Sequence, residues 1–156
     1  MVSDGDGWTY CGLGHRHWGL FGAAGLLTVR GREVLLQLRA ARVHHGGTWS
    51  IPGGARSSDE SPTRAALRES WEEIDLPASA VEPLEMFVDD HGGWSYTTVI
   101  AELVRDVQLR NNHESEEMRW VPIDDVAALP LHHGFAGSWP HLSTVLAELR
   151  VERKPI

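Results

Sequence analysis

Residues 54–76 read GARSSDESPTRAALRESWEEIDL, and the rest of the chain is interpreted from this stretch. Ser61 is a good N-cap residue and Pro62 is favoured at the first helical position, so a helix is predicted to begin there. The sequence Asp75-Leu76-Pro77 ends the pattern, because proline cannot continue a helix. We therefore predict a helix that runs from Ser61 to about Ile74.

Three carboxylates share one face of this predicted helix. Glu69, Glu72 and Glu73 are spaced i, i+3 and i+4, which places them within about 100° of arc. Like charges at this spacing repel each other, and Arg64 and Arg68 lie on only one flank. The opposite side, which we predict to be buried, carries Leu67, Trp71 and Ile74. A cluster of hard oxygen ligands is typical of a Mg²⁺ or Mn²⁺ site, although the helix pattern alone also fits an acidic surface helix.

The same stretch resembles the Nudix box, a family pattern written Gly-x5-Glu-x7-Arg-Glu-Uaa-x-Glu-Glu-x-Gly-Uaa, where Uaa is a bulky aliphatic residue. In this chain the pattern is present as Gly54-x5-Glu60-x7-Arg68-Glu69-Ser70-x-Glu72-Glu73-x-Asp75-Leu76, which matches six of the seven fixed charged or glycine positions. Ser70 replaces the aliphatic residue. Asp75 replaces the closing glycine, at a position where we expect a left-handed backbone that aspartate can adopt.

The resemblance implies a loop–helix–loop motif that binds Mg²⁺, or alternatively Mn²⁺, at a diphosphate. It assigns the metal to Glu69, Glu72, Glu73 and the carbonyl of Gly53, with Glu60 and Gly54 in support. It assigns catalysis to Glu69, Arg68 and Glu72, with Arg68 orienting a carboxylate.

The implied reaction is attack by water on a phosphorus atom of a nucleoside diphosphate linked to another moiety. The chain is thus expected to be a nucleotide pyrophosphohydrolase, an enzyme that acts on acid anhydrides in phosphorus-containing substrates. Glu69 is our first choice for the base that takes the proton from water. Glu116 and Glu117, outside the box, are the alternatives.

Periodicity and turn signals outside the box predict alternating strands and helices. The predicted strands are 21–30, 33–39, 48–51, 81–89, 95–103 and 118–122, and the further helices are a brief one at 124–129 and a closing one at 140–151. This order indicates an α/β (α+β) protein with a mixed sheet. The resemblance implies a Nudix-type α/β/α sandwich that carries the loop–helix–loop motif.

The domain prediction is an N-terminal arm at residues 1–18 and a single Nudix domain at 19–156. The arm is rich in glycine, histidine and tryptophan, so we expect it to be irregular and to be pinned to the domain by Trp8 and Trp18.

Composition narrows the function classes. The chain has 156 residues and a formal net charge of −8, which argues against a general nucleic-acid binder. Cys11 is the only cysteine, and no secretory signal is evident. The most apolar run, Gly19 to Val29, is too short to span a bilayer. We expect a cytoplasmic protein that acts on a small nucleotide without a membrane or nucleic-acid partner, and a homodimer is one expected state.

Candidates for substrate contact outside the box are Arg39, Arg42, His44, His45, Trp94 and Tyr96. The arginines and histidines would contact phosphates, and the two aromatic residues would stack a base. Surface-loop positions and ordinary sheet packing are the alternative readings. Cys11, His15 and His17 suggest zinc, but a closed structural site needs four ligands and no second pair is evident. The sequence leaves open whether these residues bind a metal.

Two other functions compete with hydrolysis. A Nudix-like module that senses a nucleotide and has weak catalysis is the first, although such modules usually lose box carboxylates. A non-hydrolytic enzyme such as an isopentenyl diphosphate isomerase is the second, and Cys11 is a poor candidate for the cysteine that it needs. The substrate itself stays open, because selectivity depends on loops rather than on the box.

Overall fold

The structure is a computed structural model that describes residues 4–41, 46–112 and 115–153. The strands are β1 (Trp8–Tyr10), β2 (Arg16–Trp18), β3 (Ala23–Arg30), β4 (Glu33–Arg39), β5 (Trp49–Ser50), β6 (Gly53–Ala55), β7 (Val81–Asp90), β8 (Ser95–Leu103) and β9 (Ser115–Pro122). The helices are α1 (Pro62–Ile74), α2 (His133–Arg153) and the 3₁₀ helices η1 (Ala78–Ala80) and η2 (Ile123–Ala128).

Within the described residues, seven strands form one mixed sheet in the order β5-β4-β3-β8-β7, with β6 paired to β3 and β9 paired to β4. Strand β3 is its centre and runs parallel to β8. It pairs with β4 only near Arg30 and with β6 near Ala23. This change of partner places Gly53 opposite Gly25 and brings the start of the box against the middle of the sheet.

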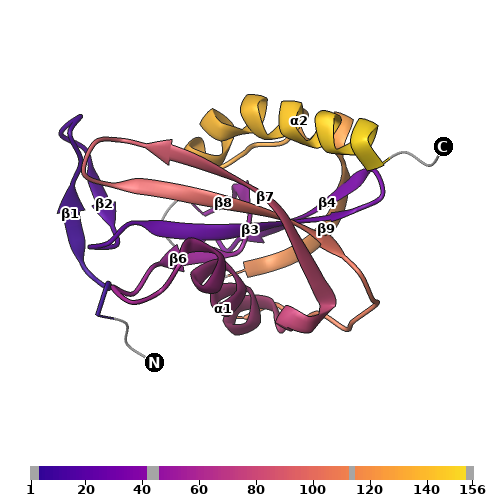
Figure 1. The fold of residues 1–156 in the computed structure, drawn as a ribbon, viewed down its shortest axis with the longest axis horizontal. Helices are drawn as coiled ribbons and strands as arrows, with labels where there is room; N and C mark the ends of the chain where they lie inside the picture. The colour runs from indigo at the N-terminus through magenta and orange to yellow at the C-terminus, as the bar shows by residue number, and fades with distance from the viewer. Residues whose placement is uncertain (1–3, 42–45, 113–114, 154–156) are drawn as a thin grey trace.

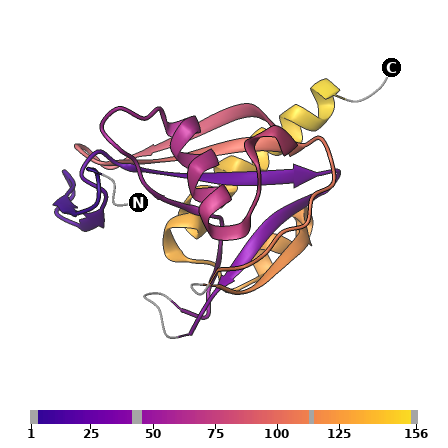
Figure 2. The same ribbon diagram turned by 90° about the horizontal axis from the view of Figure 1, so that it is seen from below.

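The two long helices cover opposite faces of the sheet (Figures 1 and 2). Successive residues of β3 point to opposite faces, so Leu26 packs in the core beside α1 and Leu27 packs in the core beside α2. Both faces are therefore buried, which explains why this strand is continuously apolar. The arrangement confirms the predicted α/β/α sandwich with a mixed sheet.

Helix α1 has the predicted bounds. The Ser61 hydroxyl accepts a hydrogen bond from the Arg64 amide at 3.1 Å, and Pro62 follows at the first helical position. Asp75 ends the helix with φ 57° and ψ 31°, so the left-handed backbone expected at the closing glycine position is present. The buried Ser70 hydroxyl donates to the Ala66 carbonyl at 2.8 Å, which satisfies the polar group that replaces the aliphatic residue.

The predicted buried face of α1 was correct for Ile74, which is 1% exposed, and wrong for Trp71. Trp71 is 55% exposed, and the buried face is turned towards the carboxylates. Its members are Ala65, Ala66, Ser70, Glu73 and Ile74. The prediction failed because a large apolar side chain is not buried by necessity, whereas small residues let a helix approach a sheet closely.

The prediction of an irregular N-terminal arm was also wrong. Strands β1 and β2 form an antiparallel hairpin in which Trp8 pairs with Trp18. These two rings pack edge to face at 5.2 Å and are 51% and 45% exposed. Contacts between the hairpin and the domain include Cys11, which is buried against Trp94, and the His17 ring, which stacks on Trp94 at 3.8 Å.

Several elements differ from prediction. Helix α2 begins at His133 rather than Pro140, which lies inside the helix. The segment at Gly53, predicted to stop a strand, is itself strand β6. The predicted helix at 124–129 is the 3₁₀ helix η2. Among the described residues, no helix has both the length and the apolar character needed to cross a membrane.

Candidate active site

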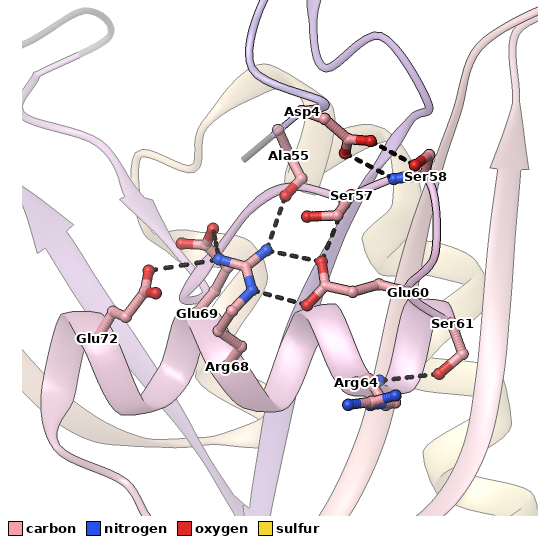
Figure 3. A network of polar contacts seen from close by, with 10 residues as sticks. All are labelled: Asp4, Ala55, Ser57, Ser58, Glu60, Ser61, Arg64, Arg68, Glu69 and Glu72. Carbon is pink, nitrogen blue, oxygen red and sulfur yellow. Dashed lines mark hydrogen bonds and ion pairs between the residues drawn. The ribbon is translucent and has the colours of Figure 1, made fainter. Parts of the chain in front are cut away.

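The guanidinium of Arg68 is the centre of the polar network on α1 (Figure 3). It binds Glu60 through two bonds, from Nε at 2.7 Å and from Nη2 at 2.9 Å. Nη1 donates to Glu69 at 2.9 Å and to Glu72 at 3.4 Å, and Nη2 also donates to the Ala55 carbonyl at 3.0 Å. An arginine has five N–H donors in a planar fork, and all of them are used here. A lysine could not replace this geometry.

This arrangement shifts the pKa values of its members in different directions. Hydrogen bonds from Arg68 lower the pKa of Glu60 from 4.5 to about 2. The contact with Glu60 raises the pKa of Arg68, so its charge is permanent. Burial raises the pKa of Glu69 even though Arg68 opposes the shift. Glu69 is therefore a stronger base than an exposed glutamate, which is the property that a proton acceptor needs.

Glu73 is bound by residues of the sheet rather than by Arg68. Its side chain is buried, one oxygen accepts from the Gly53 amide at 2.8 Å, and the other accepts from Gln37 Nε2 at 3.1 Å. These bonds orient a buried carboxylate that would otherwise be costly to bury. The box carboxylates thus divide into a buried member, Glu73, and a 43% exposed one, Glu72.

The box glycines are required by close contacts. A Cβ atom on Gly54 would lie 2.6 Å from the Glu69 carboxylate, and a Cβ on Gly53 would lie 2.5 Å from the Tyr96 hydroxyl. Approaches this close leave no room for a Cβ atom, so both positions need glycine.

Comparison with known proteins identifies the family. The family model described as "NUDIX domain" matches residues 20–142. The chain belongs to the Nudix hydrolase family. Members act on acid anhydrides in phosphorus-containing substrates, generally with divalent metal ions, and Nudix homologues act on small nucleotides.

Individual relatives agree with this assignment. A Mycobacterium tuberculosis protein named "Putative 8-oxo-dGTP diphosphatase 3" is 45% identical over 161 residues, which cover 96% of this chain and 74% of that protein. The crystal structure of a Nudix hydrolase from M. smegmatis, RenU, matches with a TM-score of 0.83 and 45% identity, covering 97% of this chain and 98% of that one. A C. elegans Ap4A hydrolase complex matches at 22% identity with a TM-score of 0.65, covering 81% of this chain and 98% of that one, and this likeness concerns the fold alone.

The residues of this Nudix hydrolase fit a divalent cation. Glu60, Glu69 and Glu72 share the single positive charge of Arg68, so the group keeps a formal excess of negative charge. The donors are all oxygens, the chemistry that hard divalent ions prefer. The space that a Gly54 side chain would fill lies directly beside the Glu69 carboxylate.

The substrate-contact candidates outside the box differ in how close they lie to the box carboxylates. The Tyr96 hydroxyl is buried near Glu73 and Glu69, whose charges add to the effect of burial in raising its pKa. The Arg39 charge partly opposes this shift, so Arg39 also lies near the box. Trp94 is buried, with one ring face covered by His17. Arg42, His44 and His45 lie outside the described residues. Substrate contact by any of these side chains stays a prediction.

The alternative bases on β9 have other partners. Glu116 accepts a hydrogen bond from the Ala41 amide at 3.1 Å, and Glu117 pairs with Arg119 at 3.0 Å. Gln37 was missed by the sequence reasoning. The available signal was a polar residue within the apolar run of residues 34–38, and it is 3% exposed in the fold. A buried amide in a central strand requires a partner, and its partner is Glu73.

Proposed function

We propose that this Nudix hydrolase uses Mg²⁺ to cleave a phosphoanhydride bond of a nucleoside triphosphate, releasing a nucleoside monophosphate and pyrophosphate. The observation that carries the proposal is the box itself, in which one fully bonded arginine holds three carboxylates beside a fourth, buried one. The name of the 45% identical mycobacterial relative makes 8-oxo-dGTP our first candidate substrate.

Each box residue has a separate role in this proposal. Glu69, Glu72, Glu73 and the Gly53 carbonyl would hold Mg²⁺, which supplies charge neutralisation and a more acidic water when bound. Glu69 would take the proton from the attacking water, because Arg68 holds its carboxylate in a fixed position. Arg68 would orient Glu69, and Glu60 would keep Arg68 in place through its two bonds. The expected ions are Mg²⁺ or, as second choice, Mn²⁺.

The experiment is a release assay for pyrophosphate and phosphate over 8-oxo-dGTP, dGTP, ADP-ribose, nucleotide sugars and dinucleotides, each with Mg²⁺ and with Mn²⁺. We expect Mg²⁺-dependent turnover of 8-oxo-dGTP that exceeds turnover of dGTP. Glu72→Gln is the preferred inactive variant because Glu72 is exposed and its loss disturbs little packing. Glu73→Gln also loses activity but places an amide against two hydrogen-bond donors. Glu82→Gln, on the exposed part of β7, is the matched control.

The competing function is nucleotide sensing. If the protein binds a nucleotide but hydrolyses none of the substrates with either metal, the hydrolase proposal is contradicted and the sensing module is favoured. If ADP-ribose or a dinucleotide is hydrolysed in preference to 8-oxo-dGTP, the proposed hydrolysis of a phosphoanhydride bond stands and only the proposed substrate is wrong.

A further inference from the structure

A second group of metal-binding side chains lies outside the Nudix box, where the N-terminal hairpin meets the β7–β8 turn. Cys11 follows β1, His17 lies in β2, and His91 lies between β7 and β8. Their ligand atoms all lie within 4.8 Å of one another. We call these three residues the hairpin cluster. The sequence had suggested Cys11, His15 and His17, and the fold replaces the exposed His15 by a histidine that is distant in the chain.

The distance between the two imidazoles matches a shared ion. His91 Nδ1 lies 3.3 Å from His17 Nε2. Two nitrogens bound to one tetrahedral zinc at 2.0–2.1 Å are separated by roughly 3.3 Å, and a zinc-bound sulfur and nitrogen by roughly 3.6 Å. The two histidines thus already have the spacing of ligands, and only a small approach of the Cys11 sulfur is needed.

Asp89 presents His91 in the form that binds a metal. Its Oδ2 lies 2.8 Å from His91 Nε2. A carboxylate only accepts, so Nε2 carries a proton, and in the neutral ring Nδ1 then has the lone pair that faces His17. Carboxylates that hold the remote nitrogen of a ligating histidine are a recurrent feature of zinc sites.

The other two members are also held in place. His17 lies flat on Trp94, with the ring planes 6° apart. Cys11 is 7% exposed. The Gly12 amide donates to the carbonyls of His91 and Gly92, which ties the hairpin to the β7–β8 turn.

We propose that Cys11, His17 and His91 bind one Zn²⁺ ion that fastens the N-terminal hairpin to the β7–β8 turn. Sulfur with imidazole nitrogen selects zinc rather than the hard ions suited to the box. Binding displaces the Cys11 thiol proton and moves the His17 proton to Nδ1, so that sulfur and both facing nitrogens are free to ligate. Three protein ligands leave a fourth position for water.

The test is a titration of the metal-free, full-length protein with Co²⁺, which replaces zinc and reports on its ligands. Cys11 is the only cysteine, so a thiolate-to-cobalt charge-transfer band can come only from the hairpin cluster. We expect such a band to saturate at one equivalent and to disappear when Zn²⁺ is added. Oxygen ligands in the box give no such band, so Glu72→Gln is expected to retain it fully.

Matched variants separate the cluster from its surroundings. Cys11→Ser and His91→Gln are expected to lose the band and the rise in Tm that Zn²⁺ causes, whereas His15→Gln retains both. Asp89→Asn is expected to keep the band but to bind Zn²⁺ about 10–100-fold more weakly in competition with a chelating dye. Circular dichroism checks that each variant is folded.

Two results would overturn the proposal. One is the absence of a thiolate band with millimolar Co²⁺ in folded wild-type protein, which would make the cluster a hydrogen-bonded packing contact. The other is a band that persists in both His17→Gln and His91→Gln, which would show that Cys11 binds the ion without the histidines. Neither result depends on hydrolase activity, so the proposed function is tested separately.

Discussion

The Nudix box and the hairpin cluster gather their ligands in opposite ways. The box takes Glu69, Glu72 and Glu73 from consecutive turns of one helix. The hairpin cluster takes Cys11 and His17 from a small hairpin and His91 from a turn 74 residues further along than His17. The first group is defined by helical spacing, and the second exists only once the sheet has formed.

The electrostatics of the two regions differ as well. In the box, one permanent cation is shared by three carboxylates and every donor is satisfied before any ion arrives. In the hairpin cluster, two imidazole rings face each other and His91 has one acidic partner, Asp89. The difference teaches that the oxygen ligands proposed for Mg²⁺ are assembled around an opposite charge, whereas the sulfur and nitrogen ligands proposed for Zn²⁺ are positioned by packing and by one carboxylate.

The largest expected effect comes from replacing Glu69 in the box, and the matched variant replaces Cys11 in the hairpin cluster. Glu69→Gln is expected to lower kcat by about 10²–10⁴-fold, because it removes the proposed proton acceptor. Cys11→Ser is expected to leave kcat close to the wild-type value. Steady-state kinetics with saturating Mg²⁺ measure both. A comparable loss in Cys11→Ser would break the comparison, since it would make the hairpin cluster part of the hydrolase site.

Arg68→Lys tests whether the box is one cooperative unit. Lysine has three donors on a single atom and cannot bind Glu60 in the two-bond geometry. We expect the free energy of unfolding in urea to fall by about 2–3 kcal/mol, because charged hydrogen bonds in a partly buried site are lost. Arg64→Lys, on the exposed side of the same helix, is the control. Equal stability of the two variants would show that the network around Arg68 contributes little.

The pH dependence of stability also tests whether the Arg68 network stabilises the fold. The pKa of Glu60 falls from 4.5 to about 2 on folding, so its ion pair is fully formed above pH 4.5 and is lost as the pH falls towards 2. Wild-type stability should therefore decrease across this window, and the decrease should be smaller in Glu60→Gln. Urea unfolding at several pH values measures it.

Glu69 is expected to have the opposite effect on stability, because its pKa is raised on folding rather than lowered. Its pKa is raised on folding, so the charged form opposes folding above that pKa. Glu69→Gln should therefore raise the Tm of the metal-free protein at pH 7, and a decrease would contradict the burial that we assign to this carboxylate.

The smallest expected effect is at the end of α1. Asp75 has a left-handed backbone, where glycine costs nothing sterically and alanine costs about 1 kcal/mol. Asp75→Ala is expected to lower the free energy of unfolding by about this amount, and Asp75→Gly to change it by less than about 0.5 kcal/mol. Asp106→Ala, in an exposed loop, is the control for charge removal. Equal losses in both Asp75 variants would point to the side chain rather than to the backbone.

Much of the fold was predictable wherever local signals were strong. The bounds of α1, β4 and β8 were correct because a proline cap, a turn or a hairpin marked each end. The N-terminal hairpin was missed because strands of three residues are too short to show periodicity. The start of α2 was misplaced because Pro140, a frequent start signal, lies within the helix.

The sequence by itself determined the carboxylate face of the box and the family, because both depend on spacing along one helix and its loop. Only the tertiary structure decided that Gln37 and Gly53 hold Glu73, that Trp71 is exposed, and that His91 joins the N-terminal hairpin. These contacts join residues from separate strands and turns. Their partners are chosen by sheet register and packing, which no local pattern encodes.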